Sequence, residues 1–453
     1  MYPRILALGL VTLCVSARAA DSIPIEDFAK PATCSKVQLA PDGQYLAFIR
    51  QNEGVPTLFF ASLDKMTKQP IALGSYHETP IPLEARRFKW ITDRRVILTA
   101  TIRGRYIAKI LAVDRDAKRC ISLLANETED ATFSDEILHA FQDGSVLMLD
   151  RKDVSGSESR LYPDVVKVDT FTARYRTVIN NPGNVLQWRA DGDGQVRLAI
   201  TDVQGPDDIQ IREGEGKNWF QLPVIGGLPV YARPLGVVGG RDVVFTGVTK
   251  ERRLAVYCVD VGKMTPAEVV FENPVFDVGP YSGAPEIEGE EASAVVFSPG
   301  MRRVLGVRYV DQIPKIKWLD EGYRKMQEQV DASLGDTINI IQGVSTDERK
   351  VLVFSFSDRD PGTYYLFDRK NGELIGLLKP RPWINPELMA GTRPIRYMAR
   401  DGVEIHGYIT IPLGVNPHDL PLVVLPHGGP WVRDVWGFDP FVQMLASRGY
   451  AVL

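Results

Sequence analysis

Residues 37–49, VQLAPDGQYLAFI, predict two short β-strands joined by a tight turn. Apolar residues fill both arms, and Asp42-Gly43 between them supplies the positive φ that such a turn needs. The same outline recurs in weaker form along the chain, at 88–98, 186–200, 295–307 and 343–356. Residues 37–49 are therefore the clearest copy of a repeated hairpin.

Each hairpin is followed by a further pair of strands that ends in Asp and turn residues. This gives seven units, near 37–79, 87–125, 133–180, 185–222, 231–271, 293–319 and 336–378. Four strands that recur about every 40–50 residues are typical of a β-propeller blade. A pair of β-sandwiches is the alternative, but it needs no repeat, and the recurring register favours the propeller. We therefore predict a mostly β fold with a seven-bladed β-propeller over residues 20–379.

One segment interrupts the strand pattern. Residues 321–334, EGYRKMQEQVDASL, predict a helix with Tyr323, Met326, Val330 and Leu334 on one stripe. Such a stripe is usually a packing face, so we expect a helix inserted in a blade. A lid over the propeller mouth is the alternative.

The composition places the chain among soluble globular proteins. It has 453 residues, of which 44% are hydrophobic and 24% charged, and a net charge of −4. No basic block stands out, which argues against a nucleic-acid partner. Arg4, the apolar run 5–15 and Ala17-Arg18-Ala19 have the pattern of a signal peptide over 1–19, with a buried N-terminal helix or strand as the alternative. We expect an exported protein, periplasmic or secreted, with no membrane span after signal removal.

Three cysteines follow this segment, Cys34, Cys120 and Cys258. Their spacings are long and form no metal-ligand pattern, so plain buried thiols are the expected state, while a disulfide between two of them stays open. The chain has no HExxH, Walker or Rossmann motif, and we expect neither metal nor cofactor.

The chain changes character after Leu378. Residues 379–386, KPRPWINP, predict an interdomain crossing, and 395–411 predict a hairpin. The apolar run 421–426 predicts a buried strand. His427-Gly428-Gly429-Pro430 follows it, and then come a predicted helix over 441–448 and a strand over 450–453.

The His-Gly-Gly-Pro segment stands where α/β sheets form their sites, at the carboxyl end of a strand. Glycines let the backbone turn sharply and leave N–H groups pointing into space, where they can hold the oxyanion of a tetrahedral intermediate. By itself the segment is equally typical of a turn at a strand end.

In its order of elements the chain resembles the prolyl oligopeptidase family of serine peptidases, and in particular its acylaminoacyl-peptidase and dipeptidyl-peptidase-like bacterial branch. The motifs that carry the resemblance are DPGTYY at 360–365, RPIRY at 393–397, ARDG at 399–402, LPHGGP at 425–430 and GYAVL at 449–453. The resemblance implies a propeller followed by the first part of an α/β-hydrolase domain, residues 380–453. It also implies hydrolysis of short peptide substrates through an acyl-enzyme.

The resemblance assigns roles to the residues of the loop. It implies that the N–H of Gly428 or Gly429 is one oxyanion donor, and that His427 and Pro430 shape the loop. The candidates for the border of the substrate cleft, with ordinary loop packing as an equal alternative, are Trp431, Arg433, Asp434 and Trp436.

The family's nucleophile lies in a Gly-x-Ser-x-Gly elbow, and these 453 residues contain none. The nearest segment, 331–335, lacks the first Gly and lies at the end of the predicted helix. We therefore expect the catalytic Ser, Asp and His beyond Leu453 and an inactive, incomplete peptidase domain. We also expect an open apolar edge at 422–425. The tail, residues 380–453, should be less stable than the propeller.

Two other functions remain open. One is a non-enzymatic propeller that binds a periplasmic partner, with the tail as a remnant. The other is a lipase or esterase, because His-Gly-Gly loops occur there too, although the large propeller argues against it.

Overall fold

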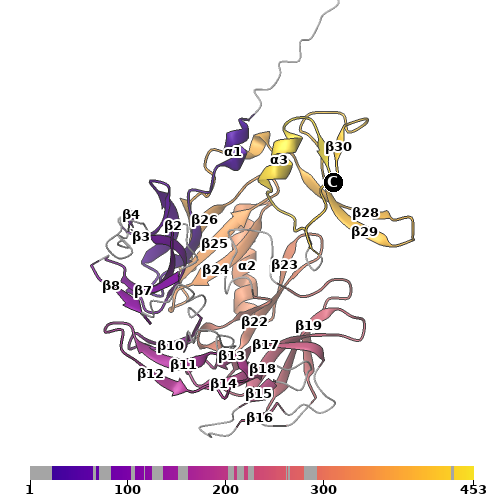
Figure 1. Cartoon of the computed structure of the whole chain (residues 1–453). Helices are drawn as coiled ribbons and strands as arrows, with labels where there is room; N and C mark the ends of the chain where they lie inside the picture. The colour runs from indigo at the N-terminus through magenta and orange to yellow at the C-terminus, as the bar shows by residue number, and fades with distance from the viewer. Residues whose placement is uncertain are drawn as a thin grey trace, which may run out of the picture.

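In the computed structural model, short strands make up most of the described residues up to Leu378 (Figure 1). The structure describes residues 23–64, 68–70, 83–103, 108–116, 118–124, 136–150, 162–201, 209–211, 219–222, 229–261, 263, 266–279, 293–429 and 433–453. The predicted signal peptide, 1–19, lies outside these residues. Within them, no helix has the length and apolar character needed to cross a membrane.

The described residues up to Leu378 form seven consecutive antiparallel sheets, each built from strands that are neighbours in the chain. The first four sheets contain β1 (Ser35–Leu39), β2 (Tyr45–Asn52), β3 (Val55–Ser62) and β4 (Lys68–Pro70); β5 (Leu83–Trp90), β6 (Arg95–Ile102), β7 (Ala108–Asp114) and β8 (Cys120–Leu123); β9 (Ile137–Ala140), β10 (Ser145–Asp150), β11 (Asp164–Asp169) and β12 (Tyr175–Ile179); and β13 (Val185–Ala190), β14 (Val196–Thr201), β15 (Ile209–Ile211) and β16 (Phe220–Gln221). The next three contain β17 (Val230–Val238), β18 (Asp242–Val248), β19 (Leu254–Asp260) and β20 (Glu268–Phe271); β21 (Val295–Phe297), β22 (Val304–Val310) and β23 (Pro314–Trp318); and β24 (Ile338–Val344), β25 (Lys350–Phe356), β26 (Thr363–Asp368) and β27 (Glu373–Leu378). A short 3-10 helix, η4 (Pro299–Met301), joins β21 to β22.

The hairpin of residues 37–49 forms as the sequence predicts. Strands β1 and β2 pair across it, and Gly43 has a φ of 67°. The Gly43 amide donates to the Ala40 carbonyl at 2.9 Å, and the Asp42 carboxylate accepts from the Gln44 amide at 2.9 Å. The turn is therefore held both by its backbone and by its aspartate.

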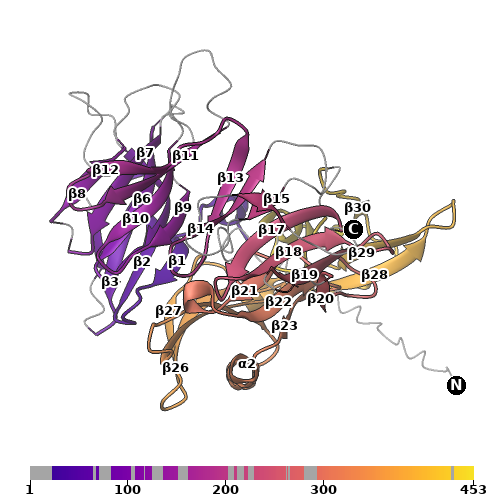
Figure 2. The same ribbon diagram turned by 90° about the horizontal axis from the view of Figure 1, so that it is seen from below.

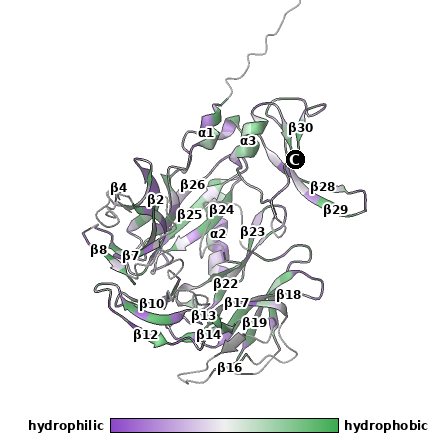
Figure 3. Cartoon of the chain, in the orientation of Figure 1, coloured by the Kyte–Doolittle hydropathy of each residue, from purple (hydrophilic) through white to green (hydrophobic). Residues whose placement is uncertain are grey.

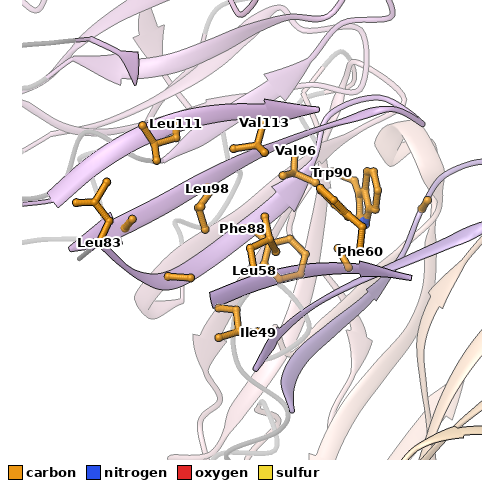
Figure 4. Packing of buried hydrophobic residues seen from close by; sticks show 14 of the residues in the cluster. Ile49, Leu58, Phe60, Leu83, Phe88, Trp90, Val96, Leu98, Leu111 and Val113 are labelled. Atoms are coloured by element: carbon orange, nitrogen blue, oxygen red, sulfur yellow. The ribbon is translucent and has the colours of Figure 1, made fainter. Parts of the chain in front are cut away.

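Separate clusters of buried apolar side chains join each sheet to the next. Figure 4 shows the first, in which Leu58 and Phe60 of β3 pack against Phe88 and Trp90 of β5. Equivalent clusters follow along the chain. The last sheet packs back on the first, through a cluster that includes Phe48 of β2. The sheets thus close into a ring, which fits a β-propeller, whereas two sandwiches would pack their sheets in face-to-face pairs.

The predicted helix forms with the predicted bounds, as α2 (Glu321–Leu334), and lies at the periphery beside β23 (Figure 2). The Asp320 carboxylate accepts from the Tyr323 amide at 3.0 Å, which caps the first turn. Tyr323, Met326 and Val330 are buried in the cluster between the sixth and seventh sheets. The stripe is therefore a packing face, as expected.

No disulfide joins the three described cysteines. Cys34 is buried and Cys258 is partly buried, and burial raises the pKa of the Cys258 thiol to about 11. The prediction of a buried thiol is wrong for Cys120, which is exposed because it begins the edge strand β8.

Candidate functional site

The residues after the crossing form an eighth sheet of a different kind. Its strands are β28 (Thr392–Met398), β29 (Glu404–Thr410), β30 (Leu422–Val423) and β31 (Ala451–Val452), in the order β28-β29-β31-β30. β28 and β29 form an antiparallel hairpin, while β30 and β31 are parallel and are connected through α3 (Pro440–Ala446). A 3-10 helix, η5 (Pro386–Leu388), lies in the crossing. Parallel pairing through a helix is the arrangement that places a site at the carboxyl end of the strands.

The structure corrects two predictions in this sheet. The run 421–426 was expected to be a buried strand, but only Leu422–Val423 is in a strand, and the side chains of Leu422 and Val424 are 52% and 62% exposed. They are exposed because β30 is an edge strand of this sheet. The helix predicted over 441–448 ends at Ala446, because the chain turns there toward Gly449, whose φ is 90°.

The His-Gly-Gly loop follows β30 directly. His427, Gly428 and Gly429 are exposed, and Nδ1 of His427 lies 2.6 Å from the Gly428 carbonyl oxygen. Within the described part of the chain, no hydrogen bond occupies the N–H of Gly428 or Gly429. A Cβ built on Gly428 would have no atom within 4 Å. The backbone of the loop therefore faces open space, as a donor group for a ligand oxygen must.

The candidates for the cleft border have different surroundings. Pro430 and Trp431 lie outside the described residues. Arg433 donates to two carbonyls of the ring, and Nε1 of Trp436 donates to the Thr392 carbonyl at 2.9 Å. Asp434 is exposed, and its carbonyl accepts from Nε of Arg433 at 3.3 Å. Arg433 and Trp436 thus hold the segment after the loop in place.

Other residues join the tail to the ring without any signal in the sequence. Oη of Tyr408 donates to the Gln312 carbonyl at 2.9 Å, and the rings of Phe276 and His406 meet edge to face at 5.7 Å. These partners lie about a hundred residues apart, so no local pattern could have paired them. In the described part of the chain, no cluster of His, Cys, Asp and Glu could hold a metal ion.

The start of the described chain also lies against the tail. Helix α1 (Ile25–Ala29) contacts α3, much of which Figure 3 colours hydrophobic. Phe28 packs with Ile384 and Met389, and Nε1 of Trp383 donates to the Asp27 carbonyl at 2.8 Å. The segment before the first sheet therefore lies beside the crossing that follows the seventh sheet.

Comparisons with known proteins give relatives of one kind. No family model matches the chain. The chain is 24% identical over 432 residues to dipeptidyl aminopeptidase BIII of Pseudoxanthomonas mexicana, which covers 92% of this chain and 58% of that protein. It is 27% identical over 181 residues to dipeptidyl peptidase family member 6 of Caenorhabditis elegans, with 35% of this chain and 24% of that protein covered. The chain thus spans 58% of the length of the first of these relatives.

Solved structures share the fold. A prolyl endopeptidase superimposes with a TM-score of 0.61 at 13% identity, covering 96% of this chain and 64% of that one. A puromycin-hydrolyzing peptidase of Mycobacterium tuberculosis gives a TM-score of 0.62 at 13% identity, with coverages of 95% and 67%.

Proposed function

We infer that this chain, a member of the prolyl oligopeptidase family of peptidases, contributes the propeller and part of the active site of a serine-type peptidase. In this proposal the seven sheets are seven blades within residues 20–379, and residues 380–453 begin an α/β-hydrolase domain. The complete enzyme would hydrolyse short peptides through an acyl-enzyme. Removal of residues 1–19 would release it into the periplasm or the medium.

The observation that carries the proposal is the pair of exposed amides at Gly428 and Gly429, whose N–H groups have no hydrogen-bond partner among the residues that the structure describes. They follow β30 at the carboxyl end of a parallel strand pair, and the segment after them lies on the ring. An amide N–H in this position can donate to the oxygen that becomes negatively charged when a peptide carbonyl is attacked. In such sites the second donor is the N–H after the nucleophilic serine, which these 453 residues do not contain in a Gly-x-Ser-x-Gly elbow.

We propose short peptides rather than folded proteins as the substrates. In the proposed arrangement the blades would stand beside the loop and limit what reaches it. The anchoring of the segment after the loop on the ring, through Arg433, favours a site that the two parts share.

A serine-reactive phosphonate tests the division of the active site. We expect the 453-residue chain to hydrolyse no fluorogenic dipeptide substrate and to take up no phosphonate, because a serine without its histidine is not activated. A labelled serine within residues 1–453 would contradict the proposal. The gene read past codon 453 gives a second test: a Gly-x-Ser-x-Gly within about a hundred residues supports the peptidase, and an immediate stop supports the binding module.

Gly428 allows a matched pair of variants in a chain that also carries the nucleophile. Gly428→Pro removes the N–H, and we expect kcat to fall about 100-fold or more, the usual cost of one lost oxyanion donor. Gly428→Ala keeps the N–H and finds free space for its methyl group, so its kcat should stay near the wild-type value. Equal kcat values for the two variants would exclude Gly428 as the donor.

A further inference from the structure

Three consecutive carbonyl groups of the ring accept hydrogen bonds from the tail. They belong to the last residue of β22 and to the first two residues of the turn between β22 and β23. Nη1 of Arg433 donates to the Val310 carbonyl at 3.1 Å, and Nη2 donates to the Asp311 carbonyl at 3.0 Å. Tyr408 donates to the third carbonyl, that of Gln312, at 2.9 Å. The guanidinium fork thus spans two neighbouring carbonyls at once, which its planar geometry allows and a lysine ammonium cannot reproduce.

The turn that offers these carbonyls is itself held in shape. The Asp311 carboxylate accepts from the amides of Gln312 and Ile313 and from Nζ of Lys315, the last at 2.7 Å. Burial alone would raise the pKa of Asp311, but these hydrogen bonds lower it below its usual value. The carboxylate is therefore ionised at neutral pH, where it keeps these hydrogen bonds and holds the turn in shape.

The side chain of Phe276, which belongs to the seven-sheet ring, also contacts Arg433. The guanidinium carbon of Arg433 lies 5.5 Å from the centroid of Phe276, and His406 contacts the same ring edge to face. A guanidinium over an aromatic face gains cation–π attraction in addition to its hydrogen bonds. Phe276 is thus contacted by the hairpin of the tail and by the segment after the His-Gly-Gly loop.

Arg433 and the carbonyls of Val310 and Asp311 form a clamp, and Arg433 lies close to the loop in the sequence. Arg433 follows Gly429 by four residues, so the two Cα atoms are at most about 14 Å apart. The residues after Arg433 also lie on the ring. Val435 packs against the cluster between the first and seventh sheets. A Cβ on Gly437 would lie 3.2 Å from Phe356 of the seventh sheet. From Arg433 onward the chain after the loop is therefore held on the ring, while the strand before the loop, β30, pairs with β31.

We propose that Arg433 is a positioning residue that ties the Gly428–Gly429 amides to the β22–β23 turn. The amides keep one orientation while the guanidinium holds the turn and lose it when the ring and the tail separate. The proposal rests on the proposed function for the chemical use of the amides. Its consequence is that the ring helps to assemble the active site, because a displacement of about 1 Å at such a site can cost 100-fold in rate.

Distances between spin labels test the clamp in the 453-residue chain. One label is placed at Asp434→Cys, directly after Arg433, and the other at Lys317→Cys on β23, both exposed positions, with Cys14, Cys34, Cys120 and Cys258 replaced by Ser. In the chain with Arg433 we expect one narrow distance distribution. Arg433→Ala should about double its width, because the loop loses its anchor on the ring. Arg433→Lys should restore part of the narrowing.

Tyr408→Phe is the matched control, since it removes a hydrogen bond to the same turn from a strand that does not carry the loop. Its distribution should equal that of the parent chain, and all variants should keep the parent's circular dichroism spectrum. An unchanged width in Arg433→Ala would overturn the proposal, and so would equal broadening in Tyr408→Phe. The distances do not depend on hydrolysis, so a failure of the peptidase assignment leaves this result readable.

Discussion

At the scale of the residue, aspartates in the turns between strands help to hold the ring together. The sequence marks them only as turn formers, but in the structure several also pair with a cation. Asp42 accepts from Nη1 of Arg115 at 2.6 Å, which joins the first sheet to the second. Asp191 is buried and accepts from Nε of Arg197 at 2.7 Å as well as from two turn amides. One carboxylate thus accepts hydrogen bonds from the turn amides and pairs with a guanidinium at the same time.

Asp368 permits a prediction about acid stability. It is buried and accepts from Arg349 at 2.9 Å and Lys350 at 2.8 Å, and these hydrogen bonds hold the pKa of its carboxyl well below its usual value. A pKa that is lower in the folded state stabilises the fold above the unfolded pKa, near 4, and this stabilisation is lost as the pH falls through the folded pKa. Asp368→Asn should therefore lower the free energy of unfolding by about 1–3 kcal/mol at pH 7, and the difference should shrink toward pH 2.

Urea unfolding of both proteins between pH 7 and pH 2.5 measures this difference. Asp93→Asn is the control, because Asp93 is exposed and makes no ion pair in the described part of the chain. A difference for Asp368→Asn that stays constant down to pH 2.5 would exclude the ionised carboxylate as its cause.

At the scale of the element, α2 shows how a helix is accommodated in a ring of strands. The sixth sheet has three described strands, and α2 follows its last strand and packs on β24 of the seventh sheet. Trp318, at the end of β23, contacts Tyr323 with ring centroids 5.4 Å apart. The helix therefore fills space between two sheets.

A substitution at Met326 tests whether α2 stabilises the fold by packing. Its side chain is 1% exposed within the cluster of the sixth and seventh sheets, and Met326→Ala should lower the free energy of unfolding by about 2–4 kcal/mol. Gln329→Ala, on the exposed face of the same helix, should change it by less than about 0.5 kcal/mol. A lid would give the opposite result, with stability unaffected by Met326→Ala.

At the scale of the whole molecule, one buried amide links the ring, the crossing and the tail. Gln443 of α3 is 2% exposed. It accepts from the Ala390 amide at 2.9 Å and donates to the carbonyls of Asp358 and Ala390 at 2.9 and 2.8 Å. Asp358 belongs to the turn between β25 and β26, so a single side chain spans all three parts.

Gln443→Leu should loosen the tail while the ring stays intact. The substitution removes the side-chain partner of two buried backbone groups of Ala390 and of the partly buried Asp358 carbonyl. Each buried group left unsatisfied costs about 1–3 kcal/mol. Hydrogen exchange should therefore accelerate in residues 390–453 and remain unchanged in β1–β3. Phe441→Tyr, at a half-exposed position of the same helix, is the control. Equal acceleration in the ring would show that the two parts unfold as one unit.

The sequence by itself determined the units of the fold. Asp-Gly turns and alternating apolar runs are local signals, and they placed the repeated hairpins and the bounds of α2, because strands and helices depend on neighbours in the chain. The sequence also located the His-Gly-Gly loop after a strand.

Only the tertiary structure decided how these units meet. The closing of the ring through Phe48 and the partners of Arg433, Tyr408 and Gln443 join segments that are tens to hundreds of residues apart, and no local pattern encodes them. The apolar composition of the run 421–426 predicts a buried strand and fails for the same reason, since burial depends on what covers a strand. The open apolar edge predicted at 422–425 agrees with the place of β30 at the end of its sheet. The hairpin predicted at 186–200 forms, with Gly192 in its turn, but only the structure shows that a Cβ on Gly192 would lie 1.6 Å from the Gly300 carbonyl oxygen, because turns of two non-consecutive sheets touch.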